Sequence, residues 1–379
     1  MKIKVMTIFG TRPEAIKMAP LVKELESRDE IESLVCVTAQ HREMLDQVLN
    51  TFDIIPEYDL NIMKAGQTLV DITTRALSSL DKVIKEVKPN IVLVHGDTTT
   101  TLAGSMAAFY NQVPVGHVEA GLRTYDKYSP YPEEVNRQIT GIIADMHFAP
   151  TEVSKSNLVN EGKKEDNIYI TGNTAIDALK TTVKENYTHE VIRNLGSDKI
   201  ILLTAHRREN LGTNMKNMFK AIKRIVDEFE DVQVVYPIHL NPLVRETAKE
   251  IFNNNQRIHM IEPLEVLDFH NFLSKAHIIM TDSGGIQEEA PSLGKPVLVL
   301  RDTTERPEGV KAGTLKLAGT SEESIYEMTK ELLENNKVYE SMSRASNPYG
   351  DGNASKYIVD AIIQKFARKD NEFLLEGKR

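Results

Sequence analysis

The sequence has one cysteine, no tryptophan and no long hydrophobic run. Cys36 has no partner for a disulfide within the chain, which is typical of a protein from a reducing compartment. No apolar stretch reaches the roughly 20 residues that cross a bilayer, and the first ten residues, MKIKVMTIFG, lack the features of a signal peptide. These absences predict a cytoplasmic protein without a membrane partner.

Positive charge is also scarce. The 46 lysines and arginines are outnumbered by 55 acidic residues, giving a formal charge of −9, and no long basic run occurs. We therefore expect no nucleic-acid partner. Cysteine–histidine metal spacing, a G-x-G-x-x-G turn after a strand, a G-x-x-x-x-G-K-[ST] loop and a G-x-S-x-G elbow are missing as well. The sequence thus predicts no metal site, no nicotinamide cofactor and no P-loop.

Short apolar runs alternate with helical patterns along the whole chain. The first half contains IKVMTIF (3–9), LVCVT (34–38), IVLVH (91–95), VPVGHV (113–118), MHFAP (146–150) and IYIT (168–171). The second half contains KIILLTA (199–205), VQVVYP (232–237), RIHMI (257–261), HIIMT (277–281), PVLVL (296–300) and TLKL (314–317). This alternation predicts right-handed βαβ units and parallel sheets. Twelve strands are too many for a (β/α)8 barrel, so we expect an α/β protein with two doubly wound, Rossmann-like domains.

The domain limits follow from the same pattern. We expect an N-terminal domain over 1–172 and a C-terminal domain over 173–352, with the polar stretch 184–198 in the inter-domain region. A last amphipathic helix, about 353–379, is expected to pack back on the first domain. Ligands of open parallel sheets bind beyond the carboxyl ends of the strands, so two such domains facing each other predict a cleft there.

Acidic side chains follow several of the predicted strands. Asp97 stands in HGDTTTT, Glu119 in HVEAGLRT, and Glu133 with Glu134 in the loop YSPYPEEVNRQ. Capping of a helix would explain Asp97, and complementarity to a helix dipole would explain Glu133 and Glu134. Glu119 has fewer structural explanations. Several carboxylates close together are also typical of acid/base catalysis, because like charges raise a pKa.

Cations and a glycine turn stand at other strand ends. Arg12 and Lys17 follow the first strand, while His206, Arg207, His239 and Arg306 follow strands of the second half. In TDSGGIQEEAPSLG, Ser283, Gly284 and Gly285 lie between a strand and a helix of about ten residues. The backbone N–H groups of such a turn suit a phosphate, although a turn that only reverses the chain has the same composition.

Taken together, these segments resemble a known family. FGTRPEAIKMAPL, HGDTTTT, HVEAGLRT, PEEVNRQ, TGNTAIDAL, TAHRREN and TDSGGIQEEAPSLGKPVLVLRDTTERPE are similar, in order and spacing, to the non-hydrolysing UDP-N-acetylglucosamine 2-epimerases. The resemblance covers nearly the whole chain. It implies the two-domain architecture of B-type glycosyltransferases, with the substrate in the cleft. It also implies reversible conversion of UDP-N-acetylglucosamine to UDP-N-acetylmannosamine for cell-surface polysaccharides, no cofactor, and a homodimer.

The resemblance also implies roles for individual residues. The diphosphate is assigned to Arg12, Ser283, Gly284 and Gly285, the ribose to Glu289, and the uracil to the segment around Leu264 and Phe269. Lys17, His206 and Arg306 line the same site, while Asp97, Glu119 and Glu133 match the acid/base carboxylates and His206 joins them in catalysis. Glu288, beside the ribose ligand, is expected to be solvated or simply helical.

The chemistry of the implied reaction favours elimination of UDP to a 2-acetamidoglucal and its re-addition. Charge on the departing UDP needs cations and N–H donors, and C2 needs a base on one face and an acid on the other. The sequence leaves open which of Asp97, Glu119 and Glu133 acts on which face of C2. Retention of the glycal requires the domains to close.

Bacterial members of the family use a second UDP-N-acetylglucosamine as an activator. Its contacts correspond to Gln40, His41, Arg207 and His239. The sequence departs from the family pattern at Glu43, where a glutamine is expected, and at Gly66, where an arginine is expected.

Three other functions remain open from the sequence. They are a glycosyltransferase of the same fold, a nucleotide-sugar sensor without catalysis, and a hydrolysing epimerase that releases free sugar. The three carboxylates argue against the sensor.

Overall fold

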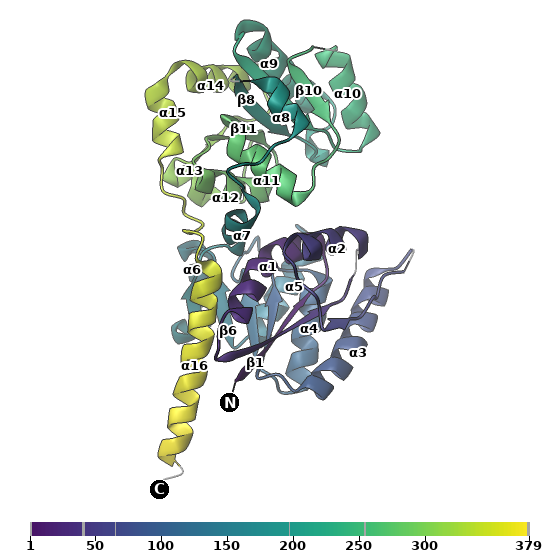
Figure 1. Ribbon diagram of the computed structural model, residues 1–379, viewed down its shortest axis with the longest axis vertical. Helices are drawn as coiled ribbons and strands as arrows, with labels where there is room; N and C mark the ends of the chain where they lie inside the picture. Colours follow the sequence, from purple (N-terminus) through teal and green to yellow (C-terminus); the bar gives the residue numbers. More distant parts are fainter. Residues whose placement is uncertain (1, 40–41, 65, 197, 254, 377–379) are drawn as a thin grey trace. The chain divides into compact units, whose positions relative to one another are not determined.

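The computed structural model describes residues 2–39, 42–64, 66–196, 198–253 and 255–376. The chain forms two compact units, one made of Met1–Thr181 with Gly350–Arg379 and the other of Thr182–Tyr349. Figure 1 shows the chain leaving the first unit after α7 and returning to it through α16. The sequence places a boundary after residue 172, before α7, and that placement stays a prediction. The polar stretch 184–198 lies within the second unit, after the crossing.

The first unit contains a sheet of seven parallel strands in the order β3-β2-β1-β4-β5-β6-β7. The strands are β1 (Ile3–Phe9), β2 (Ile31–Val37), β3 (Tyr58–Asp59), β4 (Ile91–His95), β5 (Val115–Val118), β6 (Met146–Ala149) and β7 (Ile168–Ile170). The strand order reverses between β1 and β4, and ligands of such sheets bind beyond the carboxyl ends of the strands at this switch point. The residues after β1 and β4 are therefore the first place to look for a site.

The helices of the first unit connect these strands. They are α1 (Arg12–Glu26), α2 (Arg42–Thr51), α3 (Leu69–Val87), α4 (Thr99–Tyr110), α5 (Glu133–Ile143), α6 (Glu152–Asn160), α7 (Thr174–Thr182) and α16 (Ala354–Glu376), with a 3-10 turn η1 (Glu165–Asn167). Every residue of β4, IVLVH, is buried, because helices cover both faces of a parallel sheet and leave no polar side to the strand.

The second unit repeats the plan with six parallel strands in the order β10-β9-β8-β11-β12-β13. The strands are β8 (Lys199–Thr204), β9 (Val232–Pro237), β10 (Ile258–Ile261), β11 (Ile278–Thr281), β12 (Val297–Val299) and β13 (Leu315–Leu317). The reversal here lies between β8 and β11, so the residues after these two strands occupy the second switch point.

Two hydrophobic clusters cover the faces of this second sheet. The helices that supply them are α8 (Glu190–Leu195), α9 (Thr213–Glu228), α10 (Pro242–Phe252), α11 (Val266–Lys275), α12 (Gly284–Glu289), α13 (Pro307–Ala312), α14 (Glu322–Glu334) and α15 (Asn336–Ser343), with 3-10 turns η2 (Arg208–Asn210) and η3 (Ala290–Leu293). The prediction of two doubly wound α/β domains is confirmed. All twelve expected strands are present, and the two-residue β3 is additional.

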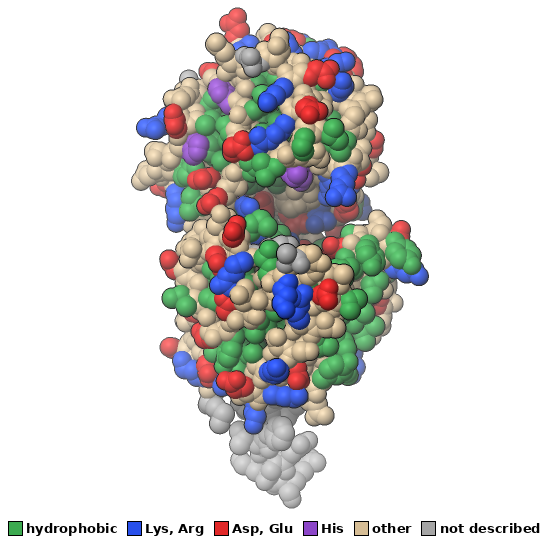
Figure 2. Space-filling model, turned by 90° about the vertical axis from the view of Figure 1, so that its right-hand side faces the viewer, with side chains coloured by type: hydrophobic (Ala, Val, Ile, Leu, Met, Phe, Trp, Pro, Cys, Tyr) green, Lys and Arg blue, Asp and Glu red, His purple; other side chains and the backbone are tan. Residues whose placement is uncertain are grey.

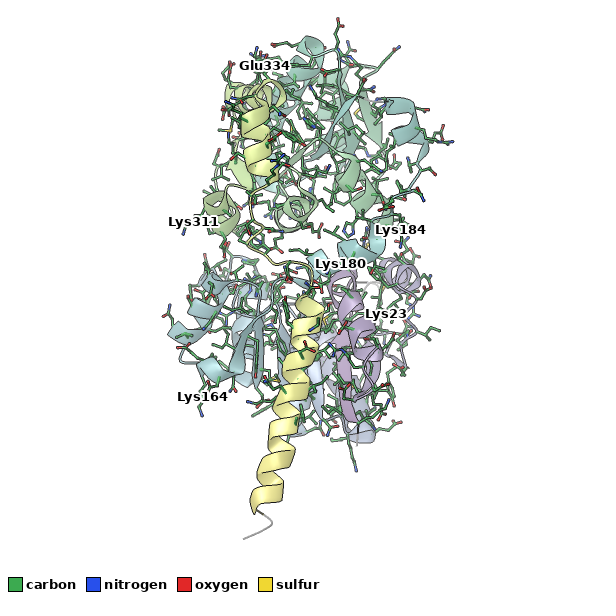
Figure 3. The ribbon with its side chains drawn as sticks, turned by 60° about the vertical axis from the view of Figure 1, so that its left-hand side comes forward. Lys23, Lys164, Lys180, Lys184, Lys311 and Glu334 are labelled. Atoms are coloured by element: carbon green, nitrogen blue, oxygen red, sulfur yellow. The ribbon has the colours of Figure 1, made fainter. Side chains whose placement is uncertain are left out.

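The last helix, α16, belongs to the first unit and packs on α1. Its Ile358, Val359 and Ile362 are fully buried, and Asp360 Oδ1 lies 2.7 Å from Nη2 of Arg28, just after α1. Figure 3 labels Lys180, near the point where the chain leaves this unit, and its Nζ donates to Asn353 Oδ1 at 2.8 Å. This bond ties the outgoing α7 to the start of the returning α16.

Candidate active site

The turn after β1 is fixed by one buried carboxylate. Glu14 Oε2 accepts from the N–H groups of Gly10 and Thr11 at 3.1 and 2.8 Å, and Oε1 accepts from Thr98 Oγ1 at 2.7 Å. Glu14 thereby joins the β1–α1 turn to the β4–α4 turn and places Arg12 at the first position of α1. Glycine is required at position 10 because a Cβ there would lie 1.9 Å from Thr38 Oγ1.

Asp97 lies in the turn after β4, as predicted. Arg137 Nη2 contacts its Oδ2 at 2.8 Å, and Asn136 Nδ2 donates to its backbone oxygen at 2.9 Å. Gly96, at φ +66°, makes the turn, and its oxygen accepts from His117 Nε2 at 2.7 Å. Burial lowers the pKa of His117 to about 3, so this histidine is neutral and carries its proton on Nε2. Asp97 is therefore held both by side chains of α5 and by the turn itself.

Glu119 follows β5 in a left-handed conformation, with φ +60°. Lys17 Nζ lies 2.5 Å from its Oε2 and His95 Nε2 lies 2.7 Å from the same oxygen. Burial raises the pKa of Glu119, but Lys17 and His95 outweigh burial and hold it well below its ordinary value. The carboxylate is thus ionised at neutral pH although its side chain is only 8% exposed. The structure brings the predicted Lys17 and Glu119 together.

Glu133 and Glu134 both begin α5 but differ in their surroundings. Glu133 is half-buried, whereas Glu134 is fully buried. Glu134 accepts from Thr124 N at 3.0 Å, Tyr125 N at 3.1 Å and Gln138 Nε2 at 2.7 Å. Glu134 therefore anchors the loop between Glu119 and α5, and Glu133 is the more accessible of the two carboxylates.

In the second unit, Asp282 organises the switch point. It is fully buried after β11, and its Oδ2 accepts from the N–H groups of His206 and Arg207 at 2.9 and 2.8 Å and from Asn210 Nδ2 at 3.0 Å. Its Oδ1 lies 3.3 Å from His206 Nδ1. This contact directs the Nε2 side of the imidazole away from Asp282. The ring of His206 is 42% exposed and stacks on His239, with centroids 5.4 Å apart.

The glycine turn begins a helix of ten residues, Gly284–Leu293, made of α12 and η3, as predicted. Gly284 and Gly285 do not have left-handed backbones, and a Cβ on Gly285 would meet no heavy atom closer than 4.0 Å. The glycines are therefore not required by the fold, which leaves their open space for a ligand. Ser283 is the N-cap residue of this helix, and its side chain forms no capping hydrogen bond.

Glu288 is expected to be solvated or helical; it is helical, in α12, but the expectation of solvent exposure is wrong. Glu288 is 2% exposed and its Oε1 pairs with Arg306 Nε, because the helical turn carries it inward against the segment after β12. Arg306 is thus fixed by an acidic partner beside the glycine turn. Glu289, the predicted ribose ligand, lies one position on, with Oε2 3.7 Å from the buried His270 Nε2.

The remaining predicted residues fall in two groups. Leu264 and Phe269, before and within α11, are partly buried against one hydrophobic cluster of the second unit. Gln40 and His41 lie outside the described residues. Glu43 is exposed in the first turn of α2, and Gly66 has φ +69°, a conformation that disfavours arginine there.

The two switch points differ in chemistry. Around the first lie the ionised Glu119 with Lys17 and Asp97 with Arg137, a helix residue of α5, which also carries Glu133, and such carboxylates suit proton transfer. The second gathers His206, Arg207, Arg306 and a helix start, which suits an anion.

Over the described part of the chain, no group of histidine, cysteine and acidic residues forms a metal site. No helix within the described ranges is long and apolar enough to cross a membrane.

Sequence reasoning missed three residues that hold these sites. Glu14 stands three positions after Thr11, the spacing of a capping box, so a local signal existed. His95 ends an apolar strand, and Asp282 precedes the glycine turn. Their partners Glu119 and His206 lie 24 and 76 positions away, and no local pattern reveals such contacts.

Comparison with known proteins gives one family. The family model described as UDP-N-acetylglucosamine 2-epimerase matches residues 23–363. The UDP-N-acetylglucosamine 2-epimerase of Bacillus subtilis is 67% identical over 378 residues, covering 100% of both chains.

Solved structures agree. The UDP-GlcNAc 2-epimerase from Neisseria meningitidis bound to UDP-GlcNAc has a TM-score of 0.85 at 53% identity, covering 96% of this chain and 100% of that one. The enzyme from Methanocaldococcus jannaschii, in complex with UDP-GlcNAc and UDP, has a TM-score of 0.77 at 35% identity with the same coverage. Since both the family match and the relatives span nearly its whole length, the chain belongs to the UDP-N-acetylglucosamine 2-epimerase family.

Proposed function

We propose that this enzyme interconverts UDP-N-acetylglucosamine and UDP-N-acetylmannosamine by inverting C2, without releasing free sugar. The observation that carries the proposal is Glu119, a buried carboxylate after β5 that is held ionised by Lys17 of α1 and His95 of β4, the elements at the strand-order switch point. The relatives that bind UDP-GlcNAc and share the fold support the substrate class.

The reaction is an elimination followed by an addition. C2 of the sugar has no neighbouring carbonyl that would acidify its hydrogen, but C1 carries a diphosphate that leaves readily. A base takes the proton from C2, the C2–H electron pair forms the C1=C2 bond, and the C1–O pair departs with UDP. UDP then adds back to C1 while an acid protonates C2 from the opposite face, which gives the epimer.

The first unit supplies the proton-transfer groups in this proposal. Glu119, which is ionised, is suited to accept a proton, and Asp97 and Glu133 are the other two carboxylates at the same sheet edge. Arg12 and Lys17, both on α1, add positive charge near them. General acid–base catalysis of this kind contributes about 10²- to 10⁴-fold to a rate.

The second unit supplies the groups for UDP. The N–H groups at Ser283, Gly284 and Gly285 and the guanidinium of Arg306 are suited to the diphosphate, with His206 held by Asp282 beside them. Glu289 is proposed to accept from the ribose hydroxyls, and Leu264 with Phe269 to contact the uracil.

One assay tests the function. The protein is incubated with UDP-N-acetylglucosamine alone in D2O and the products are followed by NMR. We expect an equilibrium mixture of the two UDP sugars, with solvent deuterium at C2, because the proton is exchanged through a carboxylate. Accumulation of free N-acetylmannosamine with UDP would overturn the non-hydrolysing assignment, and a product that keeps its C2 hydrogen would overturn the elimination.

The assembly is proposed to be a homodimer. Figure 2 shows hydrophobic side chains gathered on part of the surface of the first unit. In this unit Phe109 and Tyr110, at the end of α4, are 57% and 61% exposed. The neighbouring helix α5 packs against α4, and its Ile142 is 73% exposed. A second copy covering this patch would remove it from water. Sedimentation should give the mass of a dimer, and Phe109→Glu with Ile142→Glu should give the monomer.

A second UDP-N-acetylglucosamine is proposed to activate the enzyme, with Arg207 and His239 among its contacts and Gln40 and His41 as the remaining predicted ones. The stacking of His239 on His206 supports a link between activator and substrate residues. The cytoplasmic location and the role in cell-surface polysaccharide synthesis stay predictions.

A further inference from the structure

His95 ends β4 and lies beside the residue that the reaction uses on β5. In the register of these parallel strands His95 pairs with Val118, so Glu119 follows directly after its strand partner. His95 is 4% exposed, and its Nε2 lies 2.7 Å from Glu119 Oε2. The contact therefore joins the ends of two neighbouring, fully buried strands.

Glu119 needs external support to keep its geometry. Its φ of +60° is unfavourable for a residue with a Cβ, at a cost of roughly 1 kcal/mol or more. Such a conformation persists only when surrounding contacts fix it. Lys17 from α1 and His95 from β4 approach the carboxylate from two different elements, and both contact Oε2.

Lys17 and His95 contact the same oxygen of Glu119, so the two carboxylate oxygens have different surroundings. Within the described residues, the contacts of Lys17 and His95 both engage Oε2, and Oε1 is the oxygen left for a proton from the substrate. His95 Nε2 makes its 2.7 Å ion-pair contact from a buried strand end, whereas Lys17 reaches the same oxygen on a flexible stem that fixes charge more than position.

We propose that His95 is a positioning residue for the C2 proton transfer, which fixes Oε2 of Glu119 so that Oε1 receives the proton. The inference rests on the proposed function, because it requires Glu119 to act on C2. In the step itself the C2–H bond breaks, its electrons form the C1=C2 bond, UDP leaves with the C1–O pair, and an O–H bond forms at Oε1.

The charges around the pair come from several elements. Lys17 on α1 and His95 on β4 act directly on Glu119. His117 on β5 interacts electrostatically with His95, with His147 on β6 and with Arg123 after β5. Burial lowers the pKa of His117 to about 3 and that of His147 to about 4. Both of these histidines are neutral near pH 7, so Lys17 and His95 govern the ionisation of Glu119.

Two substitutions at His95 test the proposal. In His95→Gln the side-chain amide places an N–H where Nε2 was, whereas in His95→Asn the amide is too short to reach Oε2. We expect kcat for His95→Asn to fall about 10²-fold, with KM and UDP affinity within about twofold, and His95→Gln to retain within about tenfold of the wild-type kcat. The acid limb of the kcat–pH profile should move to higher pH in His95→Asn, because Glu119 loses a partner that lowers its pKa.

His147→Asn is the matched control, since it removes another buried histidine of the same sheet that does not act on the Glu119 carboxylate as Lys17 and His95 do. It should lower the melting temperature and leave kcat within about twofold of wild type. Equal losses of kcat in His95→Asn and His95→Gln, with no change in the pH profile, would show a merely structural role and overturn the proposal. The proposal is also overturned if His95→Asn exchanges the C2 hydrogen with solvent at the wild-type rate. Wild-type protein that binds UDP-GlcNAc without any exchange would instead overturn the proposed function.

Discussion

At the scale of single residues, the acidic side chains of the first unit rest on different supports. Asp97 is held by Arg137 and Glu119 by Lys17 and His95. Asp97→Asn and Glu119→Gln keep the shape of each side chain and remove its basicity. We expect kcat to fall roughly 10²-fold or more in each variant, with UDP affinity nearly unchanged because neither carboxylate is among the residues proposed to bind UDP. Steady-state kinetics and calorimetric titration with UDP measure the two quantities; weak UDP binding with a normal kcat at saturation would reassign these residues to binding.

Asp282 predicts a specific dependence of stability on pH. Burial raises its pKa, but hydrogen bonds from His206 and Arg207 outweigh burial and hold it below the ordinary 3.8. A carboxyl with a depressed pKa in the folded state stabilises the fold above its unfolded pKa and loses this contribution as the pH falls through the folded value. The difference in melting temperature between wild type and Asp282→Asn should therefore be largest near neutral pH and shrink below about pH 4. A difference that is constant with pH would contradict this role.

Residues could be predicted where the signal is local. Arg12, Glu119 and the glycine turn lie within a few residues of the ends of apolar strands, and the structure places them after β1, β5 and β11. For Glu288 the sequence leaves a solvated and a helical position open, and the structure places it in a helix but buried. Its burial depends on Arg306, which is 18 positions away, and no short pattern contains that pairing.

At the scale of elements, two glycine turns make opposite demands. A Cβ on Gly10 would lie 1.9 Å from Thr38 Oγ1, whereas one on Gly285 would lie no closer than 4.0 Å to any heavy atom. Gly10→Ala should lower the free energy of unfolding by about 1–3 kcal/mol through overpacking. Gly285→Ala should leave it unchanged or raise it by about 0.5–1 kcal/mol, since glycine weakens a helix.

The same pair tests the phosphate proposal. UDP affinity should fall about tenfold or more in Gly285→Ala, because the added methyl occupies the space proposed for the diphosphate. Chemical denaturation and UDP titration separate the two effects. Normal UDP affinity in Gly285→Ala would remove the glycine turn from the binding site.

Most elements were predictable from periodicity because buried parallel strands are apolar throughout and alternate with amphipathic helices. The strand β3, Tyr58–Asp59, was not, since two residues carry no period and pairing with β2 alone defines them. The side-chain contacts that hold the strand ends depend on tertiary packing in the same way.

At the scale of the whole molecule, activation by substrate is the property to measure. Glu43 stands where the resemblance leads us to expect a glutamine, and a carboxylate near a second diphosphate would weaken its binding by roughly 1 kcal/mol. Starting from UDP-N-acetylmannosamine alone, we expect a slow reverse rate that rises as UDP-N-acetylglucosamine is added, with more ligand required than in relatives that carry the glutamine and arginine. The rate without added activator decides the matter: a full rate with no lag would show that the second site is not used.

The first unit is discontinuous in sequence, and this affects how the protein is made. Its last helix, α16, packs on α1 but is synthesised only after the entire second unit, Thr182–Tyr349. Ribosomes add about 5–20 residues per second, so the helix arrives roughly 10 to 30 s after the rest of its unit. During that interval the apolar surface of α1 that α16 will cover is exposed on the nascent chain. The second unit, whose residues are contiguous, is therefore the part that completes folding first, and the sheet that carries Glu119 acquires its full covering only after α16 has been synthesised.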